Sequence, residues 1–287
     1  MSLEKALKEN KFCITAEIFP PKGVDISSSL NKARTIKKYV DAINVTDNQR
    51  AVMRMNPISL CHKLVSNGID AVLQISCRDR NSMGLSSDLL AAYSFGIRNI
   101  LAVTGDYPVR NGKMLTKPVF EMDSVQLLDL VKKLERGFDF NGAKLESSPK
   151  FIKGAVVNPS SDMMDFQIMK LKKKVDLGAS FIQTQVVFDI DSFKKFRDKT
   201  ANIKSKFLLG VFPLKSFSVA KFMAEKVPGV KVPTKILDRM EKSKDPFREG
   251  VEIVVEIINS LKSYCDGIHL MTMNDENLVK DIVEKIK

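Results

Sequence analysis

The sequence predicts an α/β protein with a single-domain (β/α)8 barrel of the TIM type over residues 1–287. Two observations predict it. Short apolar runs alternate with amphipathic helical patterns along the whole chain, and no linker or shift in composition divides it. Repeated strand–helix alternation favours a parallel sheet, and eight such units in 287 residues suit a closed barrel better than an open sheet.

Eight apolar runs are predicted as strands. They are Cys13–Phe19, Asp41–Thr46, Ala71–Cys77, Asn99–Thr104, Phe151–Asn158, Phe181–Phe188, Phe207–Pro213 and Gly267–Thr272. The first run stops at Pro20 and Pro21, because proline cannot continue a strand. It carries one carboxylate, Glu17, which must be paired, exposed at the strand end or used in proton chemistry, because burying an unpaired carboxylate is costly.

Helical patterns are predicted between these strands. They are Leu30–Tyr39, Pro57–Ser66, Ser86–Phe95, Ser124–Arg136, Met164–Asp176, Ile190–Lys199, Ser216–Lys226 and Arg248–Ser263. Two longer connections interrupt the alternation. Tyr107–Asp123 lies on the strand-to-helix side, where barrel enzymes place their active sites, and is predicted to be a lid or substrate loop; Gly137–Lys150 lies on the opposite side.

Composition excludes several classes of protein. The chain has no apolar run long enough to span a bilayer and no hydrophobic signal segment at its N-terminus, so we expect a cytoplasmic protein without membrane contact. The four cysteines and two histidines show no metal-ligand spacing, so no metal site is expected. The net charge of +12 favours anionic ligands; nucleic acid is not expected, because tryptophan is absent and aromatic residues are few.

Polar residues gather at the C-terminal ends of seven of the eight predicted strands. They are Glu17, Thr46, Asp47, Asn48, Gln74, Arg78, Asp79, Arg80, Asn81, Thr104, Gly105, Asp106, Asn158, Gln183, Gln185, Lys215 and Ser216. A rim rich in amides and carboxylates predicts a pocket that hydrogen-bonds a flat, heteroatom-rich molecule. The sequence contains neither GxGxxG nor GxxxxGK[ST], which excludes the Rossmann and P-loop types of nucleotide site.

The chain resembles methylenetetrahydrofolate reductases in their form that consists of the catalytic barrel only. The resemblance rests on TAEIFPPKG, VTDN, QISCRDRN, AVTGDYP, GAVVNP, KKKVDLGASFIQTQVVFD, GVFPLKS and IHLMTMN, in this order. It implies that reduced FAD transfers hydride to the one-carbon unit of 5,10-methylenetetrahydrofolate and gives 5-methyltetrahydrofolate. The basic charge suits a folate with an anionic polyglutamate tail.

The resemblance also implies roles for single residues. Glu17 falls on the family's general acid, which protonates a nitrogen leaving group, and Asp106 falls on the aspartate that contacts the pterin and tunes the flavin. The substrate-binding positions are Glu17, Asp106, Gln183, Gln185 and Met223. The expected FAD-binding positions are Thr46, Asn48, Gln74, Arg78, Asn81, Thr104, Gly105, Asp106, Ala155, Asn158 and Lys174.

Several positions depart from the family pattern. Residues 74–77 read QISC in place of HMTC, Thr104 replaces an arginine, and Val157 replaces a tyrosine that contacts the flavin. Val219 and Met223 stand where NADH-using members carry a glutamine and a phenylalanine. The electron donor is therefore predicted to be NAD(P)H or a partner redox protein, and the chain to work as an oligomer or hetero-complex. Two alternatives stay open: a flavin-independent folate-binding reductase or methyl carrier, and a subunit that docks a redox partner.

Overall fold

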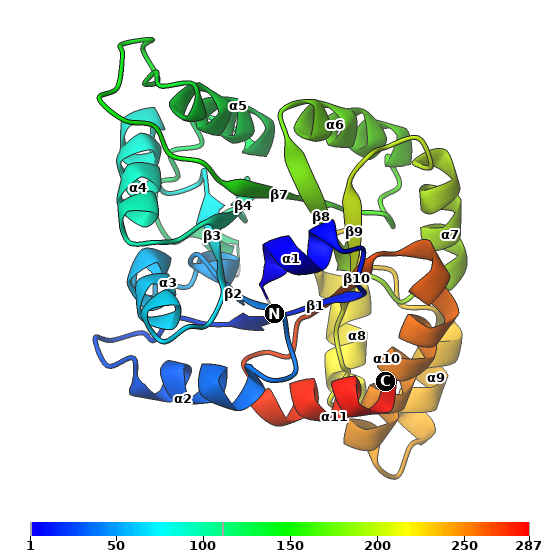
Figure 1. Ribbon diagram of the computed structural model, residues 1–287. Coiled ribbons are helices and arrows are strands. Elements are labelled where there is room, and N and C mark those ends of the chain that lie inside the picture. Colours follow the sequence, from blue (N-terminus) through cyan, green and yellow to red (C-terminus); the bar gives the residue numbers. More distant parts are fainter. Residues whose placement is uncertain (1, 111, 287) are drawn as a thin grey trace.

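The computed structural model describes residues 2–110 and 112–286. Within them, eight parallel strands close a barrel in the order β1, β10, β9, β8, β7, β4, β3, β2, and helices surround it (Figure 1). The barrel strands are β1 (Cys13–Ile18), β2 (Ala42–Val45), β3 (Ala71–Ser76), β4 (Asn99–Val103), β7 (Ile152–Val157), β8 (Ala179–Val186), β9 (Lys206–Val211) and β10 (Gly267–Leu270). The predicted (β/α)8 barrel is confirmed.

Eight of the helices were predicted with small differences at their ends. They are α2 (Ser27–Ile36), α3 (Pro57–Ser66), α4 (Ser82–Ser94), α5 (Ser124–Glu135), α6 (Met164–Asp176), α7 (Ile190–Lys199), α8 (Phe217–Lys226) and α10 (Pro246–Leu261). The predicted start of α4 at Ser86 was wrong. Asn81 caps this helix by accepting a hydrogen bond from the Gly84 N–H at 3.0 Å, so the helix begins at Ser82.

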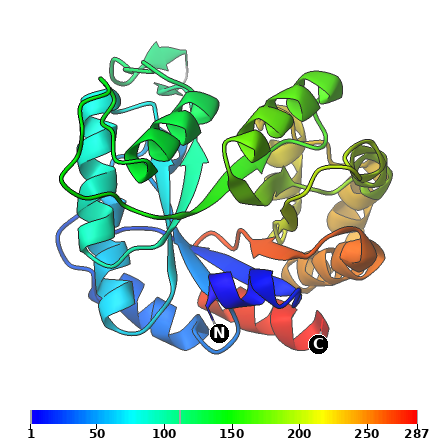
Figure 2. The same ribbon diagram turned by 45° about the horizontal axis from the view of Figure 1, so that its top comes forward.

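Other elements were not predicted. They are the helices α1 (Leu3–Lys8), α9 (Thr234–Lys242) and α11 (Glu276–Ile286), the short 3₁₀ turns Gln49–Ala51 and Lys262–Tyr264, and the strands β5 (Val109–Arg110) and β6 (Lys113–Met114). Helix α11 packs against α10 and α2, so the last helix completes the ring beside the first large one (Figure 1). Strands β5 and β6 form an antiparallel hairpin within the connection Tyr107–Asp123, and Figure 2 shows it projecting beyond α4 and α5.

The two halves of the barrel interior differ in chemistry. The half at the N-terminal ends of the strands is apolar and contains Cys13, Ala42, Val72, Leu101, Phe181 and Leu208. Leu3 and Ala6 of α1 belong to the same buried cluster, and α1 lies across this mouth of the barrel (Figure 1). Gly154 makes room for the Phe181 ring, which a side chain on Gly154 would overlap. The N-terminal end of the barrel is thus a packed core that supports stability. The active site of such barrels lies at the opposite, C-terminal end of the strands.

Candidate active site

A pocket of about 540 Å³ lies at the C-terminal ends of the strands. Ten residues predicted for cofactor or substrate line it: Glu17, Gln74, Arg78, Thr104, Gly105, Asp106, Asn158, Lys174, Gln183 and Gln185. Residues from β1, β3, β4, β7, β8 and β10 contribute to one lining, because parallel strands end at the same rim. The structure therefore brings most of the predicted rim together around one cavity.

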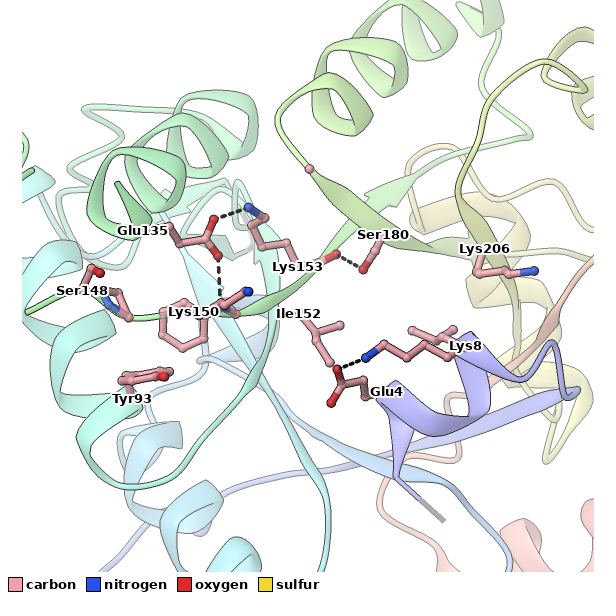
Figure 3. A pocket seen from close by; sticks show the side chains of 14 residues that line it. Glu4, Lys8, Tyr93, Glu135, Ser148, Lys150, Ile152, Lys153, Ser180 and Lys206 are labelled. Atoms are coloured by element: carbon pink, nitrogen blue, oxygen red, sulfur yellow. Dashed lines mark hydrogen bonds and ion pairs between the residues drawn. The ribbon is translucent and has the colours of Figure 1, made fainter. Parts of the chain in front are cut away.

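A larger hollow of about 820 Å³ lies at the opposite mouth, beside α1 (Figure 3). Two of its lysines are paired with neighbouring acids: Lys8 with Glu4 and Lys153 with Glu135. Lys206 is paired with Asp266, which lies outside the lining. Size alone does not make this hollow the active site, because barrel enzymes use the C-terminal face and three of the four lysines in its lining are paired with acids. The smaller pocket is therefore the candidate active site.

Glu17 is buried in the wall of the candidate site, with 6% of its surface exposed. Two side-chain nitrogens approach the same carboxyl oxygen. Gln74 Nε2 donates to Glu17 Oε1 at 3.3 Å, and His269 Nε2 lies 3.4 Å from that oxygen. Of the three possibilities that the sequence left open for Glu17, the structure therefore supports a buried carboxyl with partners.

A chain of buried polar side chains continues beneath Glu17. His269 Nδ1 lies 2.9 Å from Thr15 Oγ1, and this hydroxyl accepts from Gln183 Nε2 at 3.3 Å. Gln183 Oε1 in turn accepts from Asn44 Nδ2 at 2.9 Å. The side-chain amide of Gln183, predicted to contact the substrate, thus makes hydrogen bonds to Asn44 and Thr15 within this buried chain.

Two arginines connect the loops after β2, β3 and β4. Arg78 donates from Nε and Nη2 to both carboxylate oxygens of Asp79, and also to the carbonyl oxygens of Asn48 and Asp106. Arg80 binds both oxygens of Asp47. Burial acts to raise the pKa of Asp79, but the hydrogen bonds and the charge of Arg78 outweigh it, so the pKa is lowered. The two guanidinium groups thus fix the rim that carries Asp106.

Asp106 lies beside a backbone segment in an unusual conformation. Its Oδ2 accepts from the backbone N–H of Arg50 at 2.9 Å. Asn48, Arg50 and Ala51 all have positive φ angles, of 44°, 56° and 54°, which non-glycine residues seldom adopt. Such conformations persist only where surrounding contacts hold them, and they gather at ligand sites. Asp106 supplies one of these contacts through its Oδ2.

Five predicted residues are not part of the lining. Asn48 and Asn81 hold loop and helix backbone, since they accept from Arg54 N and Gly84 N. Ala155 and Met223 belong to the hydrophobic core around the barrel. Thr46 is fully buried, and its hydroxyl has no hydrogen-bond partner among the described residues. The ligand contacts expected of these five residues stay predictions.

A family model described as "Methylenetetrahydrofolate reductase" matches residues 2–287 of the chain. The chain belongs to the methylenetetrahydrofolate reductase family. "Methylenetetrahydrofolate reductase 1" of Schizosaccharomyces pombe is 31% identical over 229 residues, which cover 76% of this chain and 36% of that protein. "5,10-methylenetetrahydrofolate reductase" of Escherichia coli is 25% identical over 274 residues, which cover 91% of this chain and 86% of that protein.

The chain spans 36% and 43% of the lengths of its fission yeast and Caenorhabditis elegans relatives. Among solved structures, an uncharacterized protein from Clostridium thermocellum that binds two copies of 5-methyl-5,6,7,8-tetrahydrofolic acid matches with a TM-score of 0.66 at 15% identity. That match covers 99% of this chain and 96% of the other, and it supports the barrel fold.

In the described part of the chain, no helix could cross a membrane and no cluster of acids, histidines and cysteines could hold a metal ion.

Some residues of the site were not identified from the sequence as members of the family's pocket. His269 and Met271 of the last strand line it, as do Ser124 and Gln167 at the starts of α5 and α6. His269 lies within the apolar run IHLMT, and the sequence gives no signal for it beyond the lack of metal-ligand spacing at the two histidines. Its inward direction follows from its register: His269 pairs with Thr15, two residues before Glu17, so all three point into the barrel.

Lys174 brings a positive charge to the pocket. Its Nζ donates to the Val156 carbonyl oxygen at 2.7 Å. Burial, aided by the nearby charge of Lys170 and opposed by that of Asp123, lowers the pKa of Lys174 to about 8. The lysine is still mostly protonated at neutral pH, so the pocket contains a cation.

The lowered pKa of Lys174 predicts a pH-dependent stability. The unfolded chain keeps the lysine proton up to a pKa of 10.5 whereas the folded chain releases it near 8, so the free energy of unfolding should rise across this interval. Relative to Lys174→Met, which lacks this group, the wild type should gain up to about 3 kcal/mol. Urea unfolding at several pH values measures the difference. The matched control is Lys172→Met, which removes an exposed lysine of the same helix and keeps Lys174. The wild type should show no such gain relative to this control; an equal gain relative to both variants would contradict the assignment.

Proposed function

We propose that the chain reduces the methylene carbon of 5,10-methylenetetrahydrofolate to a methyl group. The observation that carries the proposal is the buried carboxyl of Glu17 in the wall of a pocket shared with Asp106 and Gln185, in a chain whose family model matches residues 2–287. The family resemblance implies a general acid and two folate ligands at these positions. A pocket rich in amides and carboxylates suits the many hydrogen-bonding atoms of a pterin.

The proposal includes FAD as cofactor, and the chain offers groups that fit a flavin. Bound reduced FAD would supply the hydride. Thr46 holds a buried hydroxyl without a partner in the described part of the chain, and a ligand atom could satisfy it. Gly105 has φ +98°, and an added Cβ would lie 2.7 Å from Ser76 Oγ, so only glycine leaves the backbone open here. Lys174 suits the negative charge of a reduced flavin or a phosphate.

The chain's own groups then bind and protonate the folate. Glu17 donates a proton to the ring nitrogen, which opens the five-membered ring because a neutral amine leaves more readily than its anion. Asp106 accepts from the paired N–H donors of the pterin through its available oxygen. Gln185 Oε1 accepts from the backbone N–H of Val186 at 3.0 Å, which leaves its NH₂ group to donate to the substrate.

The electron donor belongs to the same proposal. Met223 packs in the core with 9% of its surface exposed, whereas the neighbouring Phe222 is 40% exposed and lies 5.3 Å from the Arg50 guanidinium. A buried methionine is a poor platform for nicotinamide, which favours a partner redox protein over direct use of NAD(P)H. We further propose a cytoplasmic location, a polyglutamylated folate and an oligomeric or hetero-complex assembly, as expected from the sequence.

Substitution Glu17→Gln tests the role of the carboxyl. The variant should bind FAD as the wild type does and lose about 10²- to 10⁴-fold in the rate of folate reduction, because the amide cannot donate the proton. Single-turnover kinetics with chemically reduced enzyme measure this step. The exposed Glu146→Gln variant is the matched control and should keep full rate.

A Glu17→Gln variant with unchanged rate would contradict the proposed mechanism. If the wild type reduces folate without binding flavin, the flavin-independent alternative replaces the proposal. If the chain has no reductase activity in any assay but still assembles with a redox protein, the docking-subunit alternative replaces it.

The electron donor is tested by stopped-flow reduction of the purified flavin-bound chain. NADH and NADPH should each reduce the flavin at less than about 1 s⁻¹, the low end of enzyme turnover. Dithionite, which needs no binding site, should reduce the flavin completely in the same preparation. Rapid reduction by NADH or NADPH would show that the chain needs no partner.

A further inference from the structure

We propose that His269 positions the carboxyl of Glu17, and that a buried hydrogen-bond chain from Asn44 through Gln183 and Thr15 fixes His269 as the Nε2–H tautomer. This inference rests on the proposed function, since it concerns the proton that Glu17 gives to the folate. His269 does not need to touch the substrate in this role. It acts by holding one oxygen of Glu17.

All four members of this hydrogen-bond chain are buried, so water cannot replace the hydrogen bonds between them. Thr15 and Asn44 have no exposed surface, and Gln183 and His269 have 1% and 3%. A buried polar group without a partner destabilises the fold, so each member is expected to find a donor or acceptor among the others. Members that must all be satisfied at once leave few choices for the positions of their protons.

The order of donors and acceptors follows from the amides. Asn44 Nδ2 donates to Gln183 Oε1 at 2.9 Å. Gln183 Nε2 donates both to Asn44 Oδ1 and to the Thr15 hydroxyl oxygen, each at 3.3 Å. The single hydroxyl proton of Thr15 then has two acceptors in reach: His269 Nδ1 at 2.9 Å and the Ile268 carbonyl oxygen at 3.3 Å. Because the first contact is shorter, the Thr15 hydroxyl donates its hydrogen bond to His269 Nδ1, which acts as the acceptor.

A neutral imidazole that accepts at Nδ1 carries its proton at Nε2. His269 Nε2 lies 3.4 Å from Glu17 Oε1, the same oxygen that receives the Gln74 amide at 3.3 Å. No partner of Glu17 Oε2 is recorded within residues 2–110 and 112–286. The two N–H groups therefore occupy Oε1 and leave Oε2 as the oxygen that meets the substrate.

This arrangement supports Glu17 both before and after it gives its proton to the folate. Before it, the proton sits on Oε2, facing the pocket. During it, the C–N bond of the five-membered ring breaks, and the nitrogen takes the proton and the electron pair. The resulting iminium carbon is then electrophilic, and a bound reduced flavin would supply its hydride. Afterwards Glu17 is a carboxylate, whose charge the N–H groups of His269 and Gln74 stabilise on Oε1.

The tautomer can be observed without substrate or flavin turnover. The chain has only His62 and His269, so long-range ¹H–¹⁵N correlation spectra of ¹⁵N-histidine protein contain two imidazoles, and His62→Gln assigns them. At neutral pH, His269 should show the Nε2–H pattern, and the isosteric Thr15→Val should abolish that single tautomer. An Nδ1–H pattern would overturn the inference; it is expected if the O and N positions of the Asn44 and Gln183 amides are exchanged. A doubly protonated ring would overturn it as well.

The effect on the reaction is tested with conservative pairs of variants. His269→Leu removes the N–H and should lower kcat by about 10- to 100-fold with the KM for methylenetetrahydrofolate changed less than about threefold, because the lost interaction acts in the transition state. His269→Gln keeps an N–H and should recover most of the rate. Thr15→Ser should resemble the wild type, and Thr15→Val should lose about tenfold.

Equal losses in His269→Gln and His269→Leu, or an effect on KM alone, would show a merely structural role and overturn the inference. Thermal unfolding of each variant identifies those that fail to fold, and the small change Thr15→Val keeps the test available if the buried His269→Leu does fail. A wild type without reductase activity would overturn the proposed function, while the spectra would still decide the tautomer.

Discussion

Glu17 is a carboxyl inside a closed barrel, and the site depends on the hydrogen bonds that make its burial possible. Burying an ionisable group without partners is costly, so neighbouring strands must bring donors to it. The strand register does this: β10 aligns His269 with Thr15, and β3 supplies Gln74. A shift of one residue in any of these strands would turn the polar side chains outward.

The remaining structure supports this polar layer from below and from its rim. Below it, the apolar end of the barrel is filled by large side chains such as Phe181 and closed by α1, which keeps the strands in register. At the rim, Arg78 and Arg80 join three loops through charged hydrogen bonds and hold Asp106 beside the pocket. Glu17 and Asp106, the proposed proton donor and pterin ligand, thus sit on rigid supports, as catalysis by positioning requires.

Much of this could be predicted from the sequence. The alternation of apolar runs located all eight barrel strands, and their polar ends located Glu17, Asp106 and Gln185 at one pocket. The buried chain could not be predicted, because Thr15, Asn44 and His269 lie within strands, and only the pairing register shows that they face each other. Met223, predicted to bind the substrate, packs in the core beside the barrel, and its contact with the substrate stays a prediction.

The most direct test of the central claim is an anaerobic visible spectrum of the purified protein, before and after addition of 5-methyltetrahydrofolate. The proposed reaction runs in both directions through the same site, so the account predicts a flavin spectrum that bleaches when the methyl group returns its hydride. A colourless protein that cannot be reconstituted with FAD would contradict the account. A bound flavin that stays oxidised with saturating 5-methyltetrahydrofolate would contradict it as well.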